Sequence, residues 1–340
     1  LTLPLLPGAS AALAALALGR LRPGAPLLVI TAGTIEQEAV HGDLLAFAHA
    51  SPRPVMMLSA LDAAEEEADP DLAGARLLAA RALHRPGAGP PPILVAAVHA
   101  LQQRIPDPGA AEAATRTLAL NSEMALETLV AGLAGAGYAR AAEVAEKGTF
   151  AVRGGILDVW PPTAALPLRA EFSGDTVASL RRFDPASQTS VERIDAADIP
   201  PCRPAATLWP SDLLPEGAVV LRLDHDRIRA YAETRAAEFP GTLSWTALEE
   251  RLAARFPALE LLSGDPPPPG LPALPFPVAP AACVASSGGE AAHPDLLAAI
   301  RRRLIEPLAA LAGAGGLAVI CGDTPGSCEM LARDIPGGAG

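Results

Sequence analysis

Lysine is nearly missing from this sequence, since Lys147 is the only one among its 340 residues. A phosphate-binding loop of the G-x-x-x-x-G-K-[ST] type needs a lysine that reaches the β and γ oxygens of a bound nucleotide. Lys147 follows Glu146 and precedes Gly148, which does not match that pattern. The sequence therefore excludes a complete phosphate loop, and we expect the chain to have no ATP hydrolysis and no catalytic site of its own.

Metal ligands, stacked aromatics and membrane-spanning runs are also scarce. The cysteines show no paired metal-ligand spacing; they are Cys202, Cys283, Cys321 and Cys328. We expect free thiols in a reducing cytoplasm and no metal site. The three tryptophans are too dispersed to form a base-stacking platform. No uninterrupted apolar run reaches the roughly 18 residues of a membrane span, so we expect no membrane contact.

The charge balance argues against non-specific electrostatic binding of nucleic acid. The formal net charge is −12 at pH 7, which repels a phosphate backbone. Between residues 140 and 184 basic and acidic side chains are nearly equal in number. That local neutrality favours a protein-docking face over a phosphate track. Half of the residues are hydrophobic, enough to fill the cores of two or three domains.

Alternating apolar strands and helices predict an α/β layer with a parallel sheet. Short apolar runs of the kind buried in such sheets occupy 27–31, 55–58, 92–98 and 218–223. Helical patterns cover 9–20, 34–50, 72–83, 226–238 and 244–255. The alternation stops after about residue 113 and resumes after 204. We therefore expect one lobe that is split in sequence by an inserted domain.

The insert carries an antiparallel meander in its central part. Apolar and polar residues alternate over 149–153, and a second strand over 156–160 follows a Gly154-Gly155 reversal. A third strand covers 168–172, and further strands are expected over 176–184 and 191–199. Arg153 and Arg169 lie at non-core positions of the meander. On pattern alone the favoured interpretation is that they are ordinary solvated strand charges.

The sequence of this region resembles that of a known family. The matching positions are Tyr138, Arg140, Val144, Gly148, the run Phe150-x-Val-Arg-Gly-Gly-Ile-Leu-Asp-Val159, Pro161-Pro162, Arg169-x-Glu-Phe172 and Ser179-Leu-Arg-Arg-Phe-Asp184. They are similar to the UvrB-homology module, which occurs in the excision-repair protein UvrB and in bacterial transcription-repair coupling factors. The motifs Arg-Gly-Gly-Ile-Leu-Asp and Arg-Arg-Phe-Asp-Pro are more similar to those of the coupling factors than to those of UvrB.

The resemblance implies a domain plan. Residues 1–113 and 205–264 would form a degenerate helicase-like lobe, and 114–204 the inserted α+β domain that binds UvrA. A Pro-rich linker over 265–280 would lead to the start of a small α/β domain over 281–340. The chain begins with Leu1 and ends in an unfinished Gly-rich stretch, so we expect a fragment of a longer protein.

The resemblance also implies site residues. UvrA would be bound by Arg153, Arg169, Glu171, Phe172 and Ser173. Ser173 stands where the family often has a second aromatic residue, so the affinity for UvrA would be lower than in typical members. The place of the family's phosphate loop is taken by Gly8, Ser10, Ala11 and Ala12. Ala11 replaces the lysine and Ala12 replaces the Mg²⁺-binding hydroxyl, so no cofactor is expected here.

The function that follows from the resemblance is recruitment of UvrA, with autoregulation, by the N-terminal segment of a coupling factor. ATP and Mg²⁺, RNA polymerase and DNA would be bound by domains absent from this chain. Two alternatives are a UvrB-type ATP-dependent repair enzyme and a stand-alone UvrA-binding adaptor. Separately, Asp224-His225-Asp226 could be a metal cluster, but its strand-to-helix position favours Asp224 as an N-cap.

Overall fold

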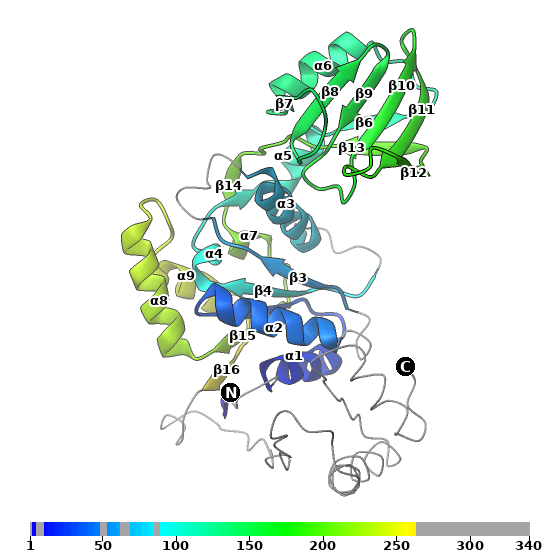
Figure 1. Ribbon diagram of the computed structural model, residues 1–340. Helices are drawn as coiled ribbons and strands as arrows, with labels where there is room; N and C mark the ends of the chain where they lie inside the picture. The colour runs from blue at the N-terminus through cyan, green and yellow to red at the C-terminus, as the bar shows by residue number, and fades with distance from the viewer. Residues whose placement is uncertain (1, 5–9, 48–52, 62–68, 85–88, 263–340) are drawn as a thin grey trace, which may run out of the picture. The chain divides into compact units, whose positions relative to one another are not determined.

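The structure is a computed structural model that describes residues 2–4, 10–47, 53–61, 69–84 and 89–262 (Figure 1). The linker expected over 265–280, the small domain expected over 281–340 and Gly8 lie outside the described residues.

A six-stranded parallel sheet forms the first layer, in the order β1-β16-β15-β2-β4-β3. Its strands are β1 (Thr2–Pro4), β2 (Leu27–Thr31), β3 (Val55–Leu58), β4 (Ile93–Ala97), β15 (Val219–Leu223) and β16 (Ala258–Leu262). β2, β4 and β15 are buried at every position, which explains why their sequences are apolar except at Thr31 and Arg222. The chain leaves this sheet after β4 and returns to it at β15, so the strands of this parallel sheet come from two separate stretches of the sequence.

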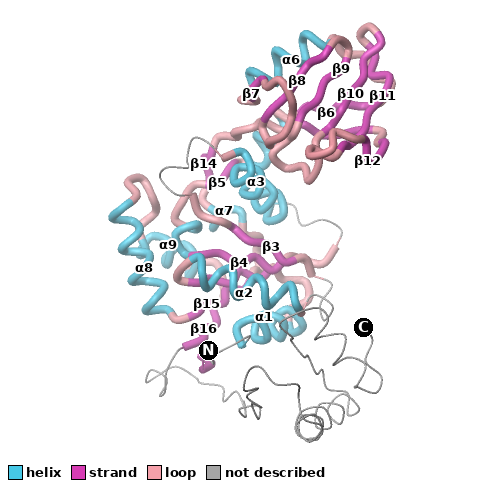
Figure 2. The backbone as a smooth tube through the Cα atoms, in the orientation of Figure 1, coloured by secondary structure: helices cyan, strands magenta, loops and turns pink. Residues whose placement is uncertain are grey.

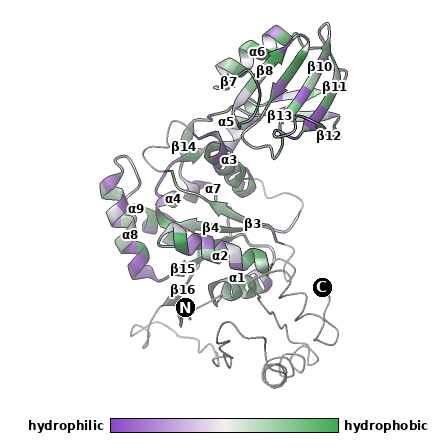
Figure 3. Ribbon diagram, viewed as in Figure 1, coloured by the Kyte–Doolittle hydropathy of each residue, from purple (hydrophilic) through white to green (hydrophobic). Residues whose placement is uncertain are grey.

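Helices cover both faces of the parallel sheet (Figures 1 and 2). On one face α1 (Ser10–Leu21) and α2 (Thr34–Ala46) pack in one core cluster. The other cluster contains α3 (Pro70–His84), α4 (Val98–Leu101), α8 (His225–Glu238) and α9 (Trp245–Ala253). In Figure 3 the strands β3 and β4 are hydrophobic, whereas α8 is largely hydrophilic and buries only Ile228 and Ala232.

Buried polar side chains fasten the strands to their connections. Gln37 donates from Nε2 to the carbonyls of Leu58 (2.7 Å) and Val95 (3.0 Å), and so joins α2 to β3 and β4. Arg53 donates from Nε to the carbonyl of Pro91 at 2.8 Å, and burial lowers the pKa of its guanidinium. Buried polar groups without hydrogen-bond partners would destabilise the fold, so these bonds favour the observed packing of helix and loop against the strands.

The insert has a second sheet of six strands, in the order β12-β11-β10-β9-β8-β7. These are β7 (Ala139–Arg140), β8 (Thr149–Arg153), β9 (Ile156–Val159), β10 (Leu168–Ser173), β11 (Thr176–Phe183) and β12 (Ser190–Arg193). Helix α6 (Leu126–Gly135) contributes Leu129 and Leu133 to the core beneath this sheet. This part of the chain therefore combines a helix with a mainly antiparallel sheet.

Short elements complete the described part of the chain. They are β5 (Ile105–Pro106), α5 (Pro108–Ala113), β6 (Arg116–Ala119), β13 (Ala196–Ile199), β14 (Ala206–Leu208) and α7 (Pro210–Leu213). β6 pairs with β13, and β5 pairs with β14.

The single strand expected over 191–199 is wrong. The chain forms β12 on the meander and then β13 on β6, in different sheets. Val191 and Ile194 are three residues apart, whereas one face of a strand repeats every two. A continuous strand could not bury Val191, Ile194 and Ile199 together, and in the structure Val191 stays 61% exposed.

Candidate functional site

The hairpin at the centre of the resemblance has the predicted form. β8 and β9 pair antiparallel with Arg153 opposite Ile156, joined by the two residues Gly154-Gly155. Gly154 has φ of 61°, a conformation that glycine adopts without strain. The carbonyl of Gly155 accepts a hydrogen bond from the backbone N–H of Phe172 at 2.7 Å. That bond ties the hairpin tip to β10.

The meander has a core face and an outer face. Opposite residues across its strands share a face, so the register defines each row. The core face packs towards α6 and includes Val152, Leu157, Ala170 and Leu180. We call the other side the outer face; its rows are Arg153, Ile156, Glu171 and Ser179, and Ala151, Asp158, Arg169 and Arg181. The two candidate arginines therefore lie on one face.

Arg169 is held inside the domain. Its Nε lies 2.7 Å from Asp158 Oδ1 and its Nη2 lies 2.9 Å from Asp158 Oδ2, a bidentate pair. Nη1 donates to the carbonyl of Gln188 at 3.1 Å, and the guanidinium carbon lies 4.3 Å above the ring of Phe183. The two side chains of the ion pair are only 18% and 4% exposed. The hydrogen bonds from Arg169 to Asp158 raise the pKa of the arginine.

Arg153 is in a different situation. Its side chain is 52% exposed, and its Nη2 lies 3.6 Å from an oxygen of Glu143, which is itself 54% exposed. Nη2 also donates to the carbonyl of Ala142 at 3.1 Å. An exposed pair of this geometry contributes little to stability. Arg153 is therefore available to a partner at small cost.

The other candidate residues do not all join this face. Glu171 pairs with Arg181 on the neighbouring strand and is 39% exposed. Phe172 is half-buried and packs against the core cluster that contains α6. Ser173 is exposed beside the β10–β11 turn, where Gly174 has φ of 61°. A β-bulge between Glu171 and Phe172 changes the register at this point.

The residues expected at the place of a phosphate loop lie at the start of the first helix. Ser10 begins α1, and Ala11 and Ala12 follow within its first turn. Both alanines are buried, at 4% and 0% exposure, in the core cluster beneath the sheet. Lys147 lies instead against α3, with its Nζ 2.6 Å from Asp71 Oδ1.

The prediction that Asp224 is an N-cap is confirmed. Its Oδ1 accepts from the backbone N–H of Arg227 at 3.3 Å, at the start of α8. His225 lies 2.8 Å from Glu249, a carboxylate on α9. Among the residues that the structure describes, no three His, Cys, Asp or Glu side chains gather as a metal site. In the same residues, no helix combines the length and apolar character that a bilayer crossing requires.

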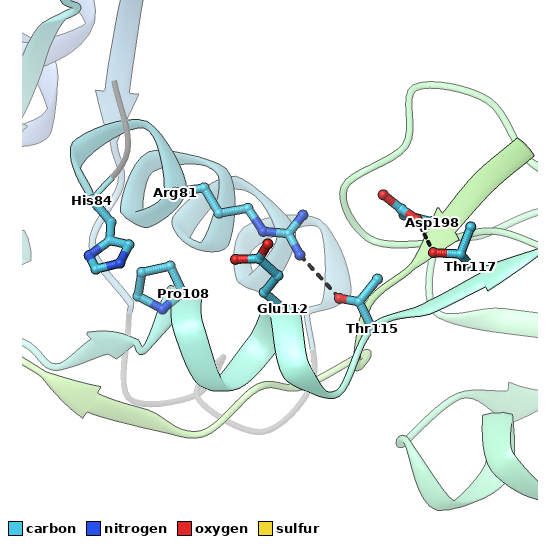
Figure 4. A pocket seen from close by; sticks show the side chains of 7 residues that line it. All are labelled: Arg81, His84, Pro108, Glu112, Thr115, Thr117 and Asp198. Carbon is cyan, nitrogen blue, oxygen red and sulfur yellow. Dashed lines mark hydrogen bonds between the residues drawn. The ribbon is translucent and has the colours of Figure 1, made fainter. Parts of the chain in front are cut away.

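A cavity of about 420 Å³ lies beside α3 and α5 (Figure 4). Its lining residues are Arg81, His84, Pro108, Glu112, Thr115, Thr117 and Asp198. Arg81 donates to Thr115 Oγ1 at 3.2 Å, and Thr117 donates to Asp198 Oδ1 at 2.6 Å. Four of the seven lining residues are therefore hydrogen-bonded to one another in pairs, and this cavity carries no functional assignment.

Comparisons with known proteins agree with the meander geometry. Residues 117–204 match the family model described as the UvrB interaction domain. The transcription-repair-coupling factor of Myxococcus xanthus is 33% identical over 163 residues, which are 48% of this chain and 12% of that protein. That of Mycobacterium tuberculosis (strain CDC 1551 / Oshkosh) is 41% identical over 130 residues, which are 37% of this chain and 10% of that protein.

The UvrABC system protein B of Thermosipho africanus is 35% identical over 86 residues, which are 25% of this chain and 13% of that protein. The matched segments thus span roughly an eighth or less of these relatives. This chain is a protein that carries a UvrB interaction domain. More particularly, it resembles the UvrB-like region of the bacterial transcription-repair-coupling factors, the family that its motifs indicate.

Proposed function

We propose that this chain recruits UvrA during transcription-coupled nucleotide excision repair, through the outer face of its meander. The observation that carries the proposal is the exposed guanidinium of Arg153 on the same face as a rigidly held Arg169, inside the matched UvrB interaction domain. Arginine suits a docking contact because its planar fork pairs with a carboxylate through two hydrogen bonds.

The charged residues of the outer face have different roles in this proposal. Arg153 supplies the direct contact, and the Glu171–Arg181 pair beside it supplies a polar rim. Arg169 is a positioning residue that keeps β9, β10 and the loop at Gln188 together. In a longer coupling factor, covering this face regulates recruitment. RNA polymerase and DNA are then bound elsewhere in that protein, which acts in the cytoplasm.

The direct test is calorimetry of the whole chain against purified UvrA. Saturable heat with a dissociation constant in the micromolar range or below is the result expected from this proposal. Absence of heat at protein concentrations well above that range, with both proteins folded by circular dichroism, would remove its basis. A stand-alone adaptor and a piece of a coupling factor behave alike in this test, and the gene sequence beyond residue 340 separates them.

We expect no ATP hydrolysis from the purified chain. The positions of the phosphate-loop lysine and hydroxyl are held by Ala11 and Ala12, whose side chains are packed in the core and offer no cation or ligand. A coupled-enzyme assay with Mg²⁺ and ATP, with and without damaged duplex, should give the rate of a buffer blank. Turnover above that blank would favour the alternative of a UvrB-type ATP-dependent repair enzyme.

Weak binding to DNA is a further expectation. The net charge of −12 opposes a phosphate backbone, and most basic side chains of the meander are already paired with carboxylates. Fluorescence anisotropy with a labelled duplex at physiological salt measures the affinity. Submicromolar binding would contradict this expectation, because it requires a basic surface that the paired charges do not provide.

A further inference from the structure

A groove with a volume of about 720 Å³ lies on the insert beside α6. It is formed by the end of α5, the start of β6, the end of α6 and the segment that follows β13. Figure 1 labels these helices and strands. Apart from Thr115 and the two arginines Arg116 and Arg203, its walls are alanine, glycine and proline. We call it the α6 groove.

The charge of the α6 groove is uncompensated. No acidic residue lines it, and both arginine side chains are exposed. In the part of the chain that the structure describes, neither Arg116 nor Arg203 forms an ion pair or a side-chain hydrogen bond. Arg169 and Arg182 of the meander each have a carboxylate within 2.7 Å, whereas Arg193 on β12 resembles the groove arginines in having no ion pair among the described residues. The groove therefore holds two positive charges that lack partners.

The guanidinium of Arg116 packs directly against Gly132 of α6. A methyl group added at Gly132 of α6 would lie 2.5 Å from the guanidinium carbon of Arg116 and 2.6 Å from its Nη2. The guanidinium thus rests directly on the helix backbone, where no larger side chain leaves room for it. Because the far end of an arginine is flexible, a side chain at 132 would displace Arg116 without disturbing the helix.

The helix end beside the groove does not repel an anion strongly. The C-terminal carbonyls of a helix carry partial negative charge when they are free. Here the carbonyls of Gly132, Leu133 and Ala134 accept hydrogen bonds from the backbone N–H groups of Ala136, Tyr138 and Gly137. This capping leaves the two guanidinium groups to dominate the potential in the groove.

We propose that the α6 groove binds an extended acidic segment of a partner protein, with Arg116 and Arg203 each pairing with a carboxylate. The small-residue floor admits a peptide backbone at close range, and the forked guanidinium groups match carboxylate geometry. A nucleic acid is disfavoured because no aromatic side chain lines the groove to stack on a base, and the chain carries a net charge of −12. This proposal is independent of the outer face.

The test uses the whole chain and a fluorescein-labelled peptide in which glutamate and alanine alternate. Anisotropy at low salt should show saturable binding, and a matched glutamine–alanine peptide should not bind. Arg116→Ala and Arg203→Ala should each weaken binding about fivefold, the effect of one exposed charge pair. Gly132→Ala keeps the charge of Arg116 but displaces its guanidinium from the groove wall. It should therefore weaken binding as Arg116→Ala does.

Arg193→Ala is the matched control, because it removes an exposed arginine from β12, outside the groove, that forms no ion pair with the residues the structure describes. Unchanged affinity in this variant, with losses in the other three, supports the proposal. An equal loss in Arg193→Ala would show attraction to general charge and overturn it. Failure of the peptide to bind, or tighter binding of a single-stranded oligonucleotide that is weakened by the same variants, would overturn it as well.

Discussion

Replacing Arg169 by alanine should lower the free energy of unfolding of this chain by about 3 kcal/mol, because it leaves a buried carboxylate without its partner. Asp158 is 4% exposed, and both of its carboxylate oxygens accept from Arg169. The alanine would also remove the bond to the carbonyl of Gln188 and the stacking on Phe183. Urea unfolding followed by circular dichroism measures the loss.

A double variant provides the control. Asp158→Leu combined with Arg169→Met replaces both charges by apolar side chains of similar size, which is often nearly neutral for a buried pair. It should therefore unfold close to the wild type, although it lacks the ion pair. An unfolding free energy for Arg169→Ala within about 0.5 kcal/mol of the wild type would mean that Arg169 is an ordinary surface charge.

The same double variant separates two roles of Arg169 in UvrA binding. If Arg169 holds the outer face in place, the folded double variant should bind UvrA nearly as well as the wild type. If Arg169 itself touches UvrA, the double variant should fold but bind weakly. The bidentate pair and the low exposure of both side chains favour the first outcome.

The sequence was enough to find the hairpin and the parallel sheet. Alternation over 149–153 and the glycine pair at 154–155 fix a two-residue turn, which sets Arg153 opposite Ile156. The apolar runs at 27–31 and 55–58 are strands with those bounds. These features depend on neighbouring residues, and local sequence carries that information.

The environment of Arg169 could not be predicted in the same way. Its pairing with Asp158 depends on the β9–β10 register, which is set across the loop at 160–167 and not by a short turn. Gln188 reaches the guanidinium from a backbone position with φ of 58°, which the sequence did not signal. The sequence placed both arginines on one face, but it did not reveal that one of them is enclosed.

Tertiary context also decided β16. No strand is predicted from the sequence at 258–262, and Ala-Leu-Glu-Leu-Leu consists of strong helix formers. In the structure β16 lies between β1 and β15 and pairs with both in parallel. Two parallel neighbours offer backbone hydrogen bonds along the whole segment, and they outweigh a modest intrinsic preference for helix.

Arg153→Ala should weaken UvrA binding by about 2 kcal/mol, roughly a 30-fold rise in the dissociation constant. The guanidinium is half exposed and its only ion pair in the described residues is 3.6 Å long, so it can exchange Glu143 for a carboxylate of UvrA at little cost. Stability should change by no more than about 0.5 kcal/mol, because no buried group loses a partner. Calorimetry of the whole chain against UvrA measures the affinity.

Arg229→Ala on α8 is the control for this prediction, because its side chain is also 52% exposed and its ion pair is 3.8 Å long. It should bind UvrA as the wild type does. Ser173→Phe should act in the opposite direction, since an aromatic side chain beside the hairpin turn would add apolar contact at the edge of the docking face. Equal affinity of wild type, Arg153→Ala and Arg229→Ala would place the UvrA contact elsewhere on the domain. Loss of affinity in both alanine variants would instead point to long-range attraction, which rising salt should abolish.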